Sequence, residues 1–268
     1  MNLVRLAREI SRCPLRWVRG PVEPGPFALL MTATITPQAG LTGLKRTDPV
    51  VRRQDYTKAL RFYLEVETEL VDRIVFVENS NSDISDLRAI AQEYPNKQVE
   101  IVSYYGLDYP ASYGRGYGEY LLMETAFEES RILRDLPPDE VLWKVTGRYI
   151  LSNYSRLWRT IPSGAKFYID VKPGRKYADT RTFAASRSSL EKFVFTARES
   201  MRTSASEREL FRVLQSHFDD LDFVGKLRVV PSFDAVAGGS NQKFYVGAEG
   251  YSDFARRALS YVAPRLWF

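Results

Sequence analysis

Apolar runs alternate with segments of helical spacing along the first half of the chain. Four of these runs predict buried strands, at residues 27–35, 73–77, 99–103 and 141–145. Between them, the spacing of apolar residues predicts helices at residues 48–65, from Ser82 or Asp83 to about 94, and from 114 to about 133. This alternation is typical of an α/β fold with a mostly parallel central sheet and helices on both of its faces.

The second half of the chain is less regular. Its apolar runs predict strands at residues 166–171 and 227–231, and its helical spacing predicts helices at 187–200 and 205–217. Residues 238–242 form a polar turn with two glycines, which suits either a lid over a binding site or a plain surface loop. We therefore expect one domain over residues 21–250, with a regular half at 27–150 and an irregular half at 151–250.

Both ends of the chain combine basic and aromatic residues with helical spacing. Within residues 1–20, an apolar and an arginine set fall on opposite faces of a helix: Leu3, Leu6, Ile10, Cys13 and Trp17 against Arg5, Arg8, Arg12, Arg16 and Arg19. Residues 251–268 form an aromatic and basic tail whose apolar face would carry Tyr251, Phe254, Ala258 and Tyr261. Such amphipathic terminal helices either pack on the domain or lie on an anionic membrane surface.

Composition narrows the class of protein. The 268 residues are 44% hydrophobic and 26% charged, which suits a globular protein rather than a disordered one. A net charge of +5 favours anionic partners such as phosphorylated substrates, acidic lipid or nucleic acid. The single cysteine, Cys13, excludes a disulfide framework and fits a reducing, cytoplasmic setting. We expect no membrane-spanning helix and no signal peptide, because arginines interrupt the apolar positions of the first residues.

Polar and charged side chains follow directly after the buried strands. Lys144, Thr146, Gly147 and Arg148 come at the end of the fourth predicted strand. In open α/β sheets, ligands bind just beyond the carboxyl ends of the strands. A lysine, a threonine and an arginine at this edge can gather around a phosphate or a sugar, although ordinary ion pairing with nearby carboxylates would also explain the two cations.

Common nucleotide and metal motifs do not fit the chain. A dinucleotide fold needs its glycine-rich turn after the first strand, whereas Gly114, Gly116 and Gly118 follow the third. The single histidine, His217, excludes most histidine-based catalysis and histidine-rich metal sites. The one Asp-x-Asp sequence, residues 220–222, follows a predicted helix and is interpreted as a solvated turn, so no metal ligand is predicted.

The order of elements and the Lys-x-Thr-Gly-Arg-Tyr and Gly-Tyr-Gly-Glu blocks resemble the GT-A glycosyltransferases, in particular bacterial enzymes that build O-antigen and capsular polysaccharides. The resemblance implies a nucleotide-sugar donor bound across the first four strand ends. The residues it assigns to donor binding are Thr34, Glu78, Asn79, Arg115, Gly116, Glu119, Lys144, Thr146, Gly147 and Arg148. It further implies a nucleotide-binding half at residues 27–150 and an acceptor half at 151–250.

The chain departs from that family at the fourth strand, where the family has a metal-binding Asp-x-Asp and this sequence has Lys144-Val145-Thr146. The departing diphosphate gathers negative charge, which fixed cations can stabilise in place of a metal. We therefore expect a metal-independent transferase with no resident cofactor, in which Lys144 and Arg148, with Arg115, stabilise the leaving group.

A carboxylate is needed to deprotonate an acceptor hydroxyl in an inverting transfer. The candidates are, in order, Asp179 in an expected loop at residues 177–181, Asp170 in an apolar strand where it either pairs with Lys172 or acts in catalysis, and Glu207 at a helix start. The expected acceptor is a glycan, in particular a lipid-linked one, on the inner membrane face, and nucleic acid is not an expected partner. Two alternatives remain: an S-adenosylmethionine-dependent methyltransferase, and a non-enzymatic basic module that binds membrane or nucleic acid.

Overall fold

The computed structural model describes residues 22–41, 43–202 and 205–244, so the expected arm at 1–20 and tail at 251–268 lie outside the described residues. Within the described residues, no helix has the length and apolar character to cross a membrane.

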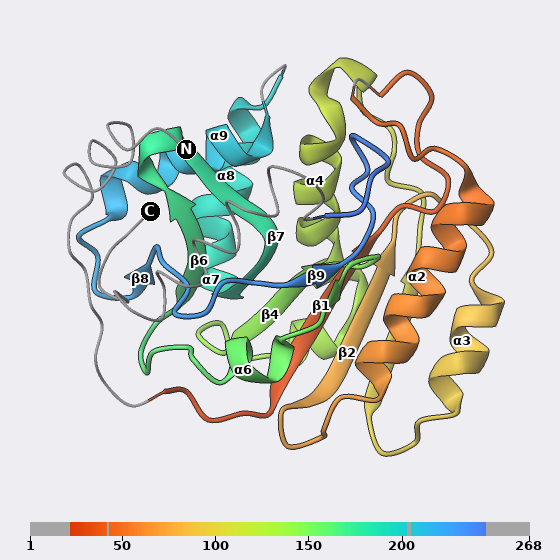
Figure 1. Ribbon diagram of the computed structural model, residues 1–268, viewed down its shortest axis with the longest axis horizontal. Helices are drawn as coiled ribbons and strands as arrows, with labels where there is room; N and C mark the ends of the chain where they lie inside the picture. The colour runs from red at the N-terminus through yellow and green to blue at the C-terminus, as the bar shows by residue number, and fades with distance from the viewer. Residues whose placement is uncertain (1–21, 42, 203–204, 245–268) are drawn as a thin grey trace.

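A seven-stranded sheet forms the centre of the molecule, in the order β3-β2-β1-β4-β7-β6-β8 (Figure 1). The strands β1 (Phe27–Ala33), β2 (Val71–Glu78), β3 (Gln98–Ser103) and β4 (Val141–Thr146) are parallel. Strand β7 (Tyr177–Ser186) runs antiparallel to both β4 and β6 (Phe167–Lys172), and β8 (Phe223–Val224) is parallel to β6. The mostly parallel sheet predicted from the sequence is confirmed.

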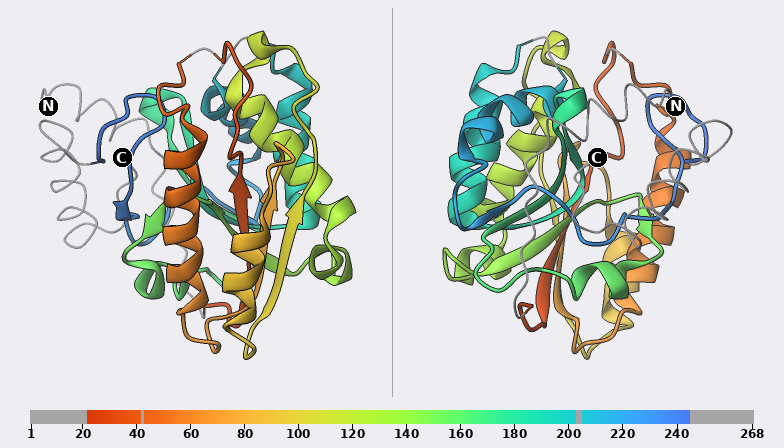
Figure 2. Two further views of the ribbon diagram at one scale, coloured as in Figure 1. Left: turned by 90° about the vertical axis from the view of Figure 1, so that its right-hand side faces the viewer. Right: turned by 60° about the vertical axis from the view of Figure 1, so that its left-hand side comes forward.

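Helices cover both faces of the sheet, as the apolar pattern predicts (Figure 2). On one face, α2 (Pro49–Leu64) and α3 (Ser85–Gln92) pack on alternate residues of β1 and β2, among them Leu29, Ile74 and Phe76. On the other face, α4 (Gly114–Glu129), α8 (Thr196–Ser200) and α9 (Ser206–Leu214) pack on the residues between, such as Leu30 and Val75. Every residue of β1 is buried, because both of its faces are covered.

Shorter elements complete the described chain. The helices are α5 (Arg131–Asp135), α6 (Tyr154–Trp158) and α7 (Arg187–Ser189), the short helical turns are Ala111–Tyr113, Pro173–Arg175, Leu190–Phe195 and Gln215–His217, and a second sheet pairs β5 (Ile150–Leu151) with β9 (Phe233–Asp234).

Two sequence predictions in the second half are wrong. Residues 227–231 are not a strand; the nearby strands β8 and β9 lie on either side of this segment. Residues 177–181 are not a loop but the first half of β7, where Asp179 is paired in register with Asp170 of β6. Asp179 in this strand is buried because it pairs with Lys172 of β6 and with Arg181, so the sequence here lacks the apolar run that marks β1 to β4.

The order of the strands creates a crevice at the centre of the sheet. From β1 the chain proceeds through β2 and β3 on one side, then crosses to β4 on the other side of β1. At such a switch point the connections leave the two adjacent strands in opposite directions, and the space beyond their carboxyl ends is open to a ligand. Gly147 is needed here, because a Cβ at this position would lie 2.7 Å from the carbonyl oxygen of Thr32 on β1.

Candidate functional site

A cavity of about 540 Å³ lies beyond the carboxyl ends of β1 and β4, at this switch point. Its walls come from the end of β1 and the loop that follows, the first turns of α4, the residues after β4, the turn between β6 and β7, the start of α9, and residues 237–240. In Figure 1 the loop after β9 lies between α4 and the loop that leads to α2, so segments distant in sequence close the cavity.

The walls carry more cations than carboxylates. The basic lining residues are Arg52, Arg115, Arg148, Lys172, Arg175 and Arg181. The acidic lining residues are Glu119 and Glu207. A cavity with this charge balance attracts an anionic ligand.

Two of the three basic lining residues on the β6–β7 side, Lys172 and Arg181, pair with buried carboxylates. Arg181 donates to Asp179 through Nε at 2.8 Å and Nη2 at 2.5 Å. Lys172 Nζ lies 3.5 Å from Asp179 Oδ2 and 3.7 Å from Asp170 Oδ2. Burial acts to raise the pKa of Asp179, but Arg181 and Lys172 hold it well below its ordinary value. This cluster therefore adds little net attraction for an anion.

Three other arginines in the wall of the cavity have no carboxylate partner in the described chain. Arg148 is 8% exposed; it donates to the carbonyl oxygen of Val236 and, at 3.0 Å, to the hydroxyl of Tyr149. Arg52 is 5% exposed and donates to the carbonyl oxygens of Thr34 and Arg46 and to a tyrosine hydroxyl. Arg115 is exposed at the first turn of α4, and no described side chain pairs with it.

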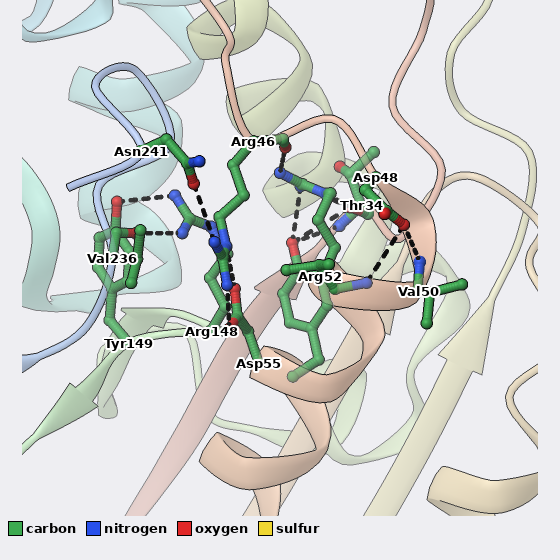
Figure 3. A network of polar contacts seen from close by, with 12 residues as sticks. Thr34, Arg46, Asp48, Val50, Arg52, Asp55, Arg148, Tyr149, Val236 and Asn241 are labelled. Carbon is green, nitrogen blue, oxygen red and sulfur yellow. Dashed lines mark hydrogen bonds and ion pairs between the residues drawn. The ribbon is translucent and has the colours of Figure 1, made fainter. Parts of the chain in front are cut away.

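Arg148 and Arg46 both contact the segment at residues 236–241, Arg148 at Val236 and Arg46 at Asn241 (Figure 3). A Cβ on Gly238 would lie 2.6 Å from Nη2 of Arg148, and one on Gly239 would lie 3.3 Å from Nη1 of Arg115. The carbonyl oxygen of Gly238 accepts from the backbone of Arg46, whose own carbonyl accepts from Arg52. Burial raises the pKa of the Tyr149 hydroxyl, which accepts from Arg148, while the positive charges of Arg148, Arg181 and Arg115 act to lower it.

Lys144 lies beneath the cavity rather than in its wall. Its side chain has no exposed surface, and its ammonium donates to Glu119 Oε1 at 2.6 Å, to the carbonyl oxygen of Thr180 at 2.7 Å, and to Thr146 Oγ1 at 3.3 Å. An ammonium has three hydrogens, so these bonds use all of its donors. The direct phosphate contact expected of Lys144 is therefore corrected: its charge is committed to Glu119.

The expected contacts of β2 with a nucleotide do not match the geometry either. Glu78 is fully buried and accepts from the backbone nitrogens of Ile35, Ser80 and Ser82, so it joins the loops that follow β1 and β2. Asn79 is also buried and accepts from the hydroxyl of Thr34 at 2.6 Å. Of these three predicted residues, Thr34 alone lines the cavity.

The glycine-rich start of α4 allows close packing against neighbouring side chains and also forms part of the cavity wall. Side chains of Ser206 and Tyr109 occupy the positions where Cβ atoms of Gly116 and Gly118 would project. The turn brings α9 against α4 and carries Arg115, Gly116 and Glu119 to the wall of the cavity.

The carboxylates named as candidate bases take a different order in the structure. Asp179 and Asp170 do not line the cavity and face cations within the sheet, as the alternative of pairing with Lys172 predicts for Asp170. Glu207 lines the cavity at the start of α9 and accepts from the hydroxyl of Ser206 at 3.1 Å. Glu207, the last of the three in the sequence-based order, is the one in position to meet a substrate.

Sequence reasoning missed several lining residues. Arg52 is the most informative, since it precedes Tyr56 by one helical turn and therefore shares the apolar face of α2. An arginine on the buried face of a helix is a signal that could have been read from the pattern. Arg175 and Tyr177 reach the cavity only because the β6–β7 turn folds over it, which no local pattern indicates.

The described residues contain no group of three or more histidine, cysteine, aspartate or glutamate side chains arranged to hold a metal ion. No family model matches the chain, and no curated protein matches it. Among solved structures, the chain is similar to the crystal structure of HddC from Yersinia pseudotuberculosis, at 11% sequence identity and a TM-score of 0.36, over 88% of this chain and 99% of that chain. A match at this level does not identify a function, which therefore rests on the chemistry of the cavity.

Proposed function

We propose that the chain is a nucleotide-sugar-dependent glycosyltransferase of the GT-A type. The observation that carries the proposal is the set of three arginines, Arg52, Arg115 and Arg148, that line a cavity at the switch point without a carboxylate partner in the described chain. Arg52 and Arg148 are buried, and a buried cation is costly unless it is compensated; a phosphate group can compensate guanidinium groups through paired, charge-assisted hydrogen bonds. The volume of about 540 Å³ is within the usual range of small-molecule sites.

In this proposal the arginines stabilise the leaving group. As the bond between the anomeric carbon and the diphosphate oxygen breaks, its electron pair passes to the phosphate, where negative charge accumulates. Arg148 and Arg115 can donate to those oxygens, because at present Arg148 donates only to neutral acceptors and Arg115 is exposed. Fixed guanidinium groups would then do what a metal ion does elsewhere, so we propose metal-independent transfer.

Glu207 is the proposed general base. It would accept the proton of an acceptor hydroxyl while that oxygen attacks the anomeric carbon, which gives inversion at this carbon. Its support is its place in the wall of the cavity, where the hydroxyl of Ser206 donates to it at 3.1 Å.

The charge of the cavity favours this reaction over the methyltransferase alternative. S-adenosylmethionine carries a positive sulfonium centre and no phosphate, so a cavity lined by several arginines would repel its reactive end. A lipid-linked glycan as the acceptor, and a place on the inner membrane face, are parts of the same proposal that rest on the amphipathic pattern of residues 1–20.

The test is thermal stabilisation by UDP, GDP, CDP, TDP and S-adenosylmethionine, each with and without Mn²⁺ or EDTA. A ligand that binds only the folded state raises the melting temperature. We expect a shift with one nucleoside diphosphate that survives EDTA and is lost in Arg148→Met. The matched control is Arg61→Met, which removes an exposed arginine of α2 that pairs with Glu93. A shift with S-adenosylmethionine only, or an Arg148→Met protein that still responds fully, would contradict the proposal.

A further inference from the structure

Only one of the two carboxylate oxygens of Glu119, in the wall of this cationic cavity, accepts hydrogen bonds from described residues. Glu119 Oε1 accepts from Lys144 at 2.6 Å, from the hydroxyl of Thr32 at 3.0 Å and from that of Thr146 at 3.3 Å. No described donor reaches Oε2, although the side chain is 23% exposed and lines the cavity. The three bonds to one oxygen fix the plane of the carboxylate and leave the second oxygen as an acceptor.

The pair with Lys144 keeps this carboxylate charged without weakening the anion site. Burial acts to raise the pKa of Glu119, but the charge and hydrogen bond of Lys144 hold it below its ordinary value. Because Lys144 has no exposed surface, it cannot itself meet a ligand, and its charge cancels that of Glu119 from below. The net positive charge of the arginines is therefore retained.

A fixed carboxylate oxygen repels phosphate and accepts hydrogen bonds from hydroxyl groups. Glu119, Arg115 and Arg148 line the same cavity, so one small molecule bound there can contact both the carboxylate and the guanidinium groups. A ligand with phosphates alone would bind the arginines and leave Glu119 Oε2 without a hydrogen-bond donor. A ligand that carries hydroxyl groups beside its phosphates would satisfy both.

We propose that Glu119 is a specificity-determining residue that selects polyhydroxylated phosphate esters by accepting a hydrogen bond from a ligand hydroxyl, with Lys144 as its positioning residue. The inference rests on the proposed function in that it assigns this hydroxyl to the same nucleotide-sugar, on either its ribose or its transferred sugar. A purely structural Glu119 would have the same Oε1 contacts but would not distinguish ligands by their hydroxyl groups.

Calorimetric titration tests this with inorganic pyrophosphate, the nucleoside diphosphate that gives the best thermal shift, and its glucose ester. In Glu119→Gln we expect the pyrophosphate affinity to stay within about threefold and the affinity for a hydroxyl-bearing ligand to fall roughly tenfold or more, because an ionic hydrogen bond becomes a neutral one. A loss that appears already with the nucleoside diphosphate assigns the ribose hydroxyl, and a loss that appears only with the glucose ester assigns the sugar hydroxyl.

Two further variants keep the result interpretable. Glu124→Gln in the same helix removes a glutamate that pairs with Arg198 at 2.6 Å and should leave all three affinities unchanged. If Glu119→Gln does not fold, the double variant Glu119→Gln/Lys144→Met removes both buried charges together and should show the same selective loss. An equal loss for pyrophosphate, or no loss for any hydroxyl-bearing ligand, would overturn the inference.

Failure of the proposed function gives a different result. If no nucleotide binds, glucose 1-phosphate is compared with inorganic phosphate. A preference for glucose 1-phosphate that disappears in Glu119→Gln would support the role of Glu119 and contradict a nucleotide donor. The absence of any preference for the hydroxyl-bearing ester would overturn the role of Glu119 itself.

Discussion

Lys144→Met separates a structural role of Lys144 from the direct phosphate contact that its sequence position suggests. The side chain is fully buried and makes three hydrogen bonds, of which only the one to Glu119 joins opposite charges. Removing one partner of a buried ion pair costs about 3–5 kcal/mol, because the other charge is left uncompensated. Glu119 is 23% exposed and can recover some hydration, so we expect the lower end, about 3 kcal/mol.

The assay is urea unfolding followed by circular dichroism, combined with a double-mutant cycle. Glu119→Gln alone should also destabilise the fold, since it leaves the ammonium of Lys144 buried without a countercharge. The double variant should cost less than the sum of the two single variants, with a coupling energy of about 2 kcal/mol or more. In parallel, the folded double variant Lys144→Met/Glu119→Gln, which removes both charges of the pair, should bind pyrophosphate within about threefold of the wild-type affinity.

Additive costs in this cycle, with a coupling energy below about 0.5 kcal/mol, would refute the ion pair as the reason for the buried lysine. A loss of pyrophosphate affinity of about 100-fold in the folded double variant Lys144→Met/Glu119→Gln would refute the placement of Lys144 beneath the cavity and would restore it as a phosphate ligand.

Four further outcomes are expected. In the folded protein the pKa of Glu119 lies below its ordinary value of 4.5. The charged carboxylate therefore stabilises the fold above pH 4.5, and this contribution is lost as the pH falls through the folded pKa. The difference in unfolding free energy between wild type and Lys144→Met should accordingly narrow in urea titrations at acid pH. Gly147→Ala should destabilise the fold by about 1–3 kcal/mol in urea, because the added Cβ would lie 2.7 Å from a β1 carbonyl oxygen. Glu207→Gln should lower the rate of sugar transfer or donor hydrolysis by about 10²–10⁴ while calorimetry finds unchanged nucleotide affinity. Asp179→Asn should instead lower the melting temperature and leave the rate per folded molecule within about threefold, because this carboxylate neutralises its buried neighbours.

The first half of the fold could be predicted from the sequence because its strands are buried on both faces. A strand such as β1, with no polar position before Thr32, gives a continuous apolar run that local pattern identifies. Strand β7 is also mostly buried but contains Asp179, Thr180 and the partly exposed Arg181, and the burial of Asp179 depends on partners such as Lys172 in β6. Pairing of this kind is non-local, so it has no periodic signature in the sequence.

The same distinction explains the candidate site. Because ligands bind beyond the carboxyl ends of strands in open α/β sheets, the end of the fourth predicted strand indicated where the cavity lies. The same reasoning correctly predicted Arg148 and Thr146 as lining residues, since the end of a buried strand is a local feature of the sequence. It could not tell that Lys144, two residues earlier on β4, lies beneath the cavity wall in an ion pair with Glu119 of α4. It also missed Arg52, which joins the site only through the packing of α2 on β1.

The most direct measurement is a crystal structure with the nucleoside diphosphate that stabilises the protein best. We predict its diphosphate between the guanidinium groups of Arg148 and Arg115, where Gly238 and Gly239 now approach them, and a hydroxyl group within hydrogen-bond distance of Glu119 Oε2. A diphosphate bound to the Lys172 and Arg181 cluster, or outside this cavity altogether, would contradict the proposal that the arginines without carboxylate partners form the donor site.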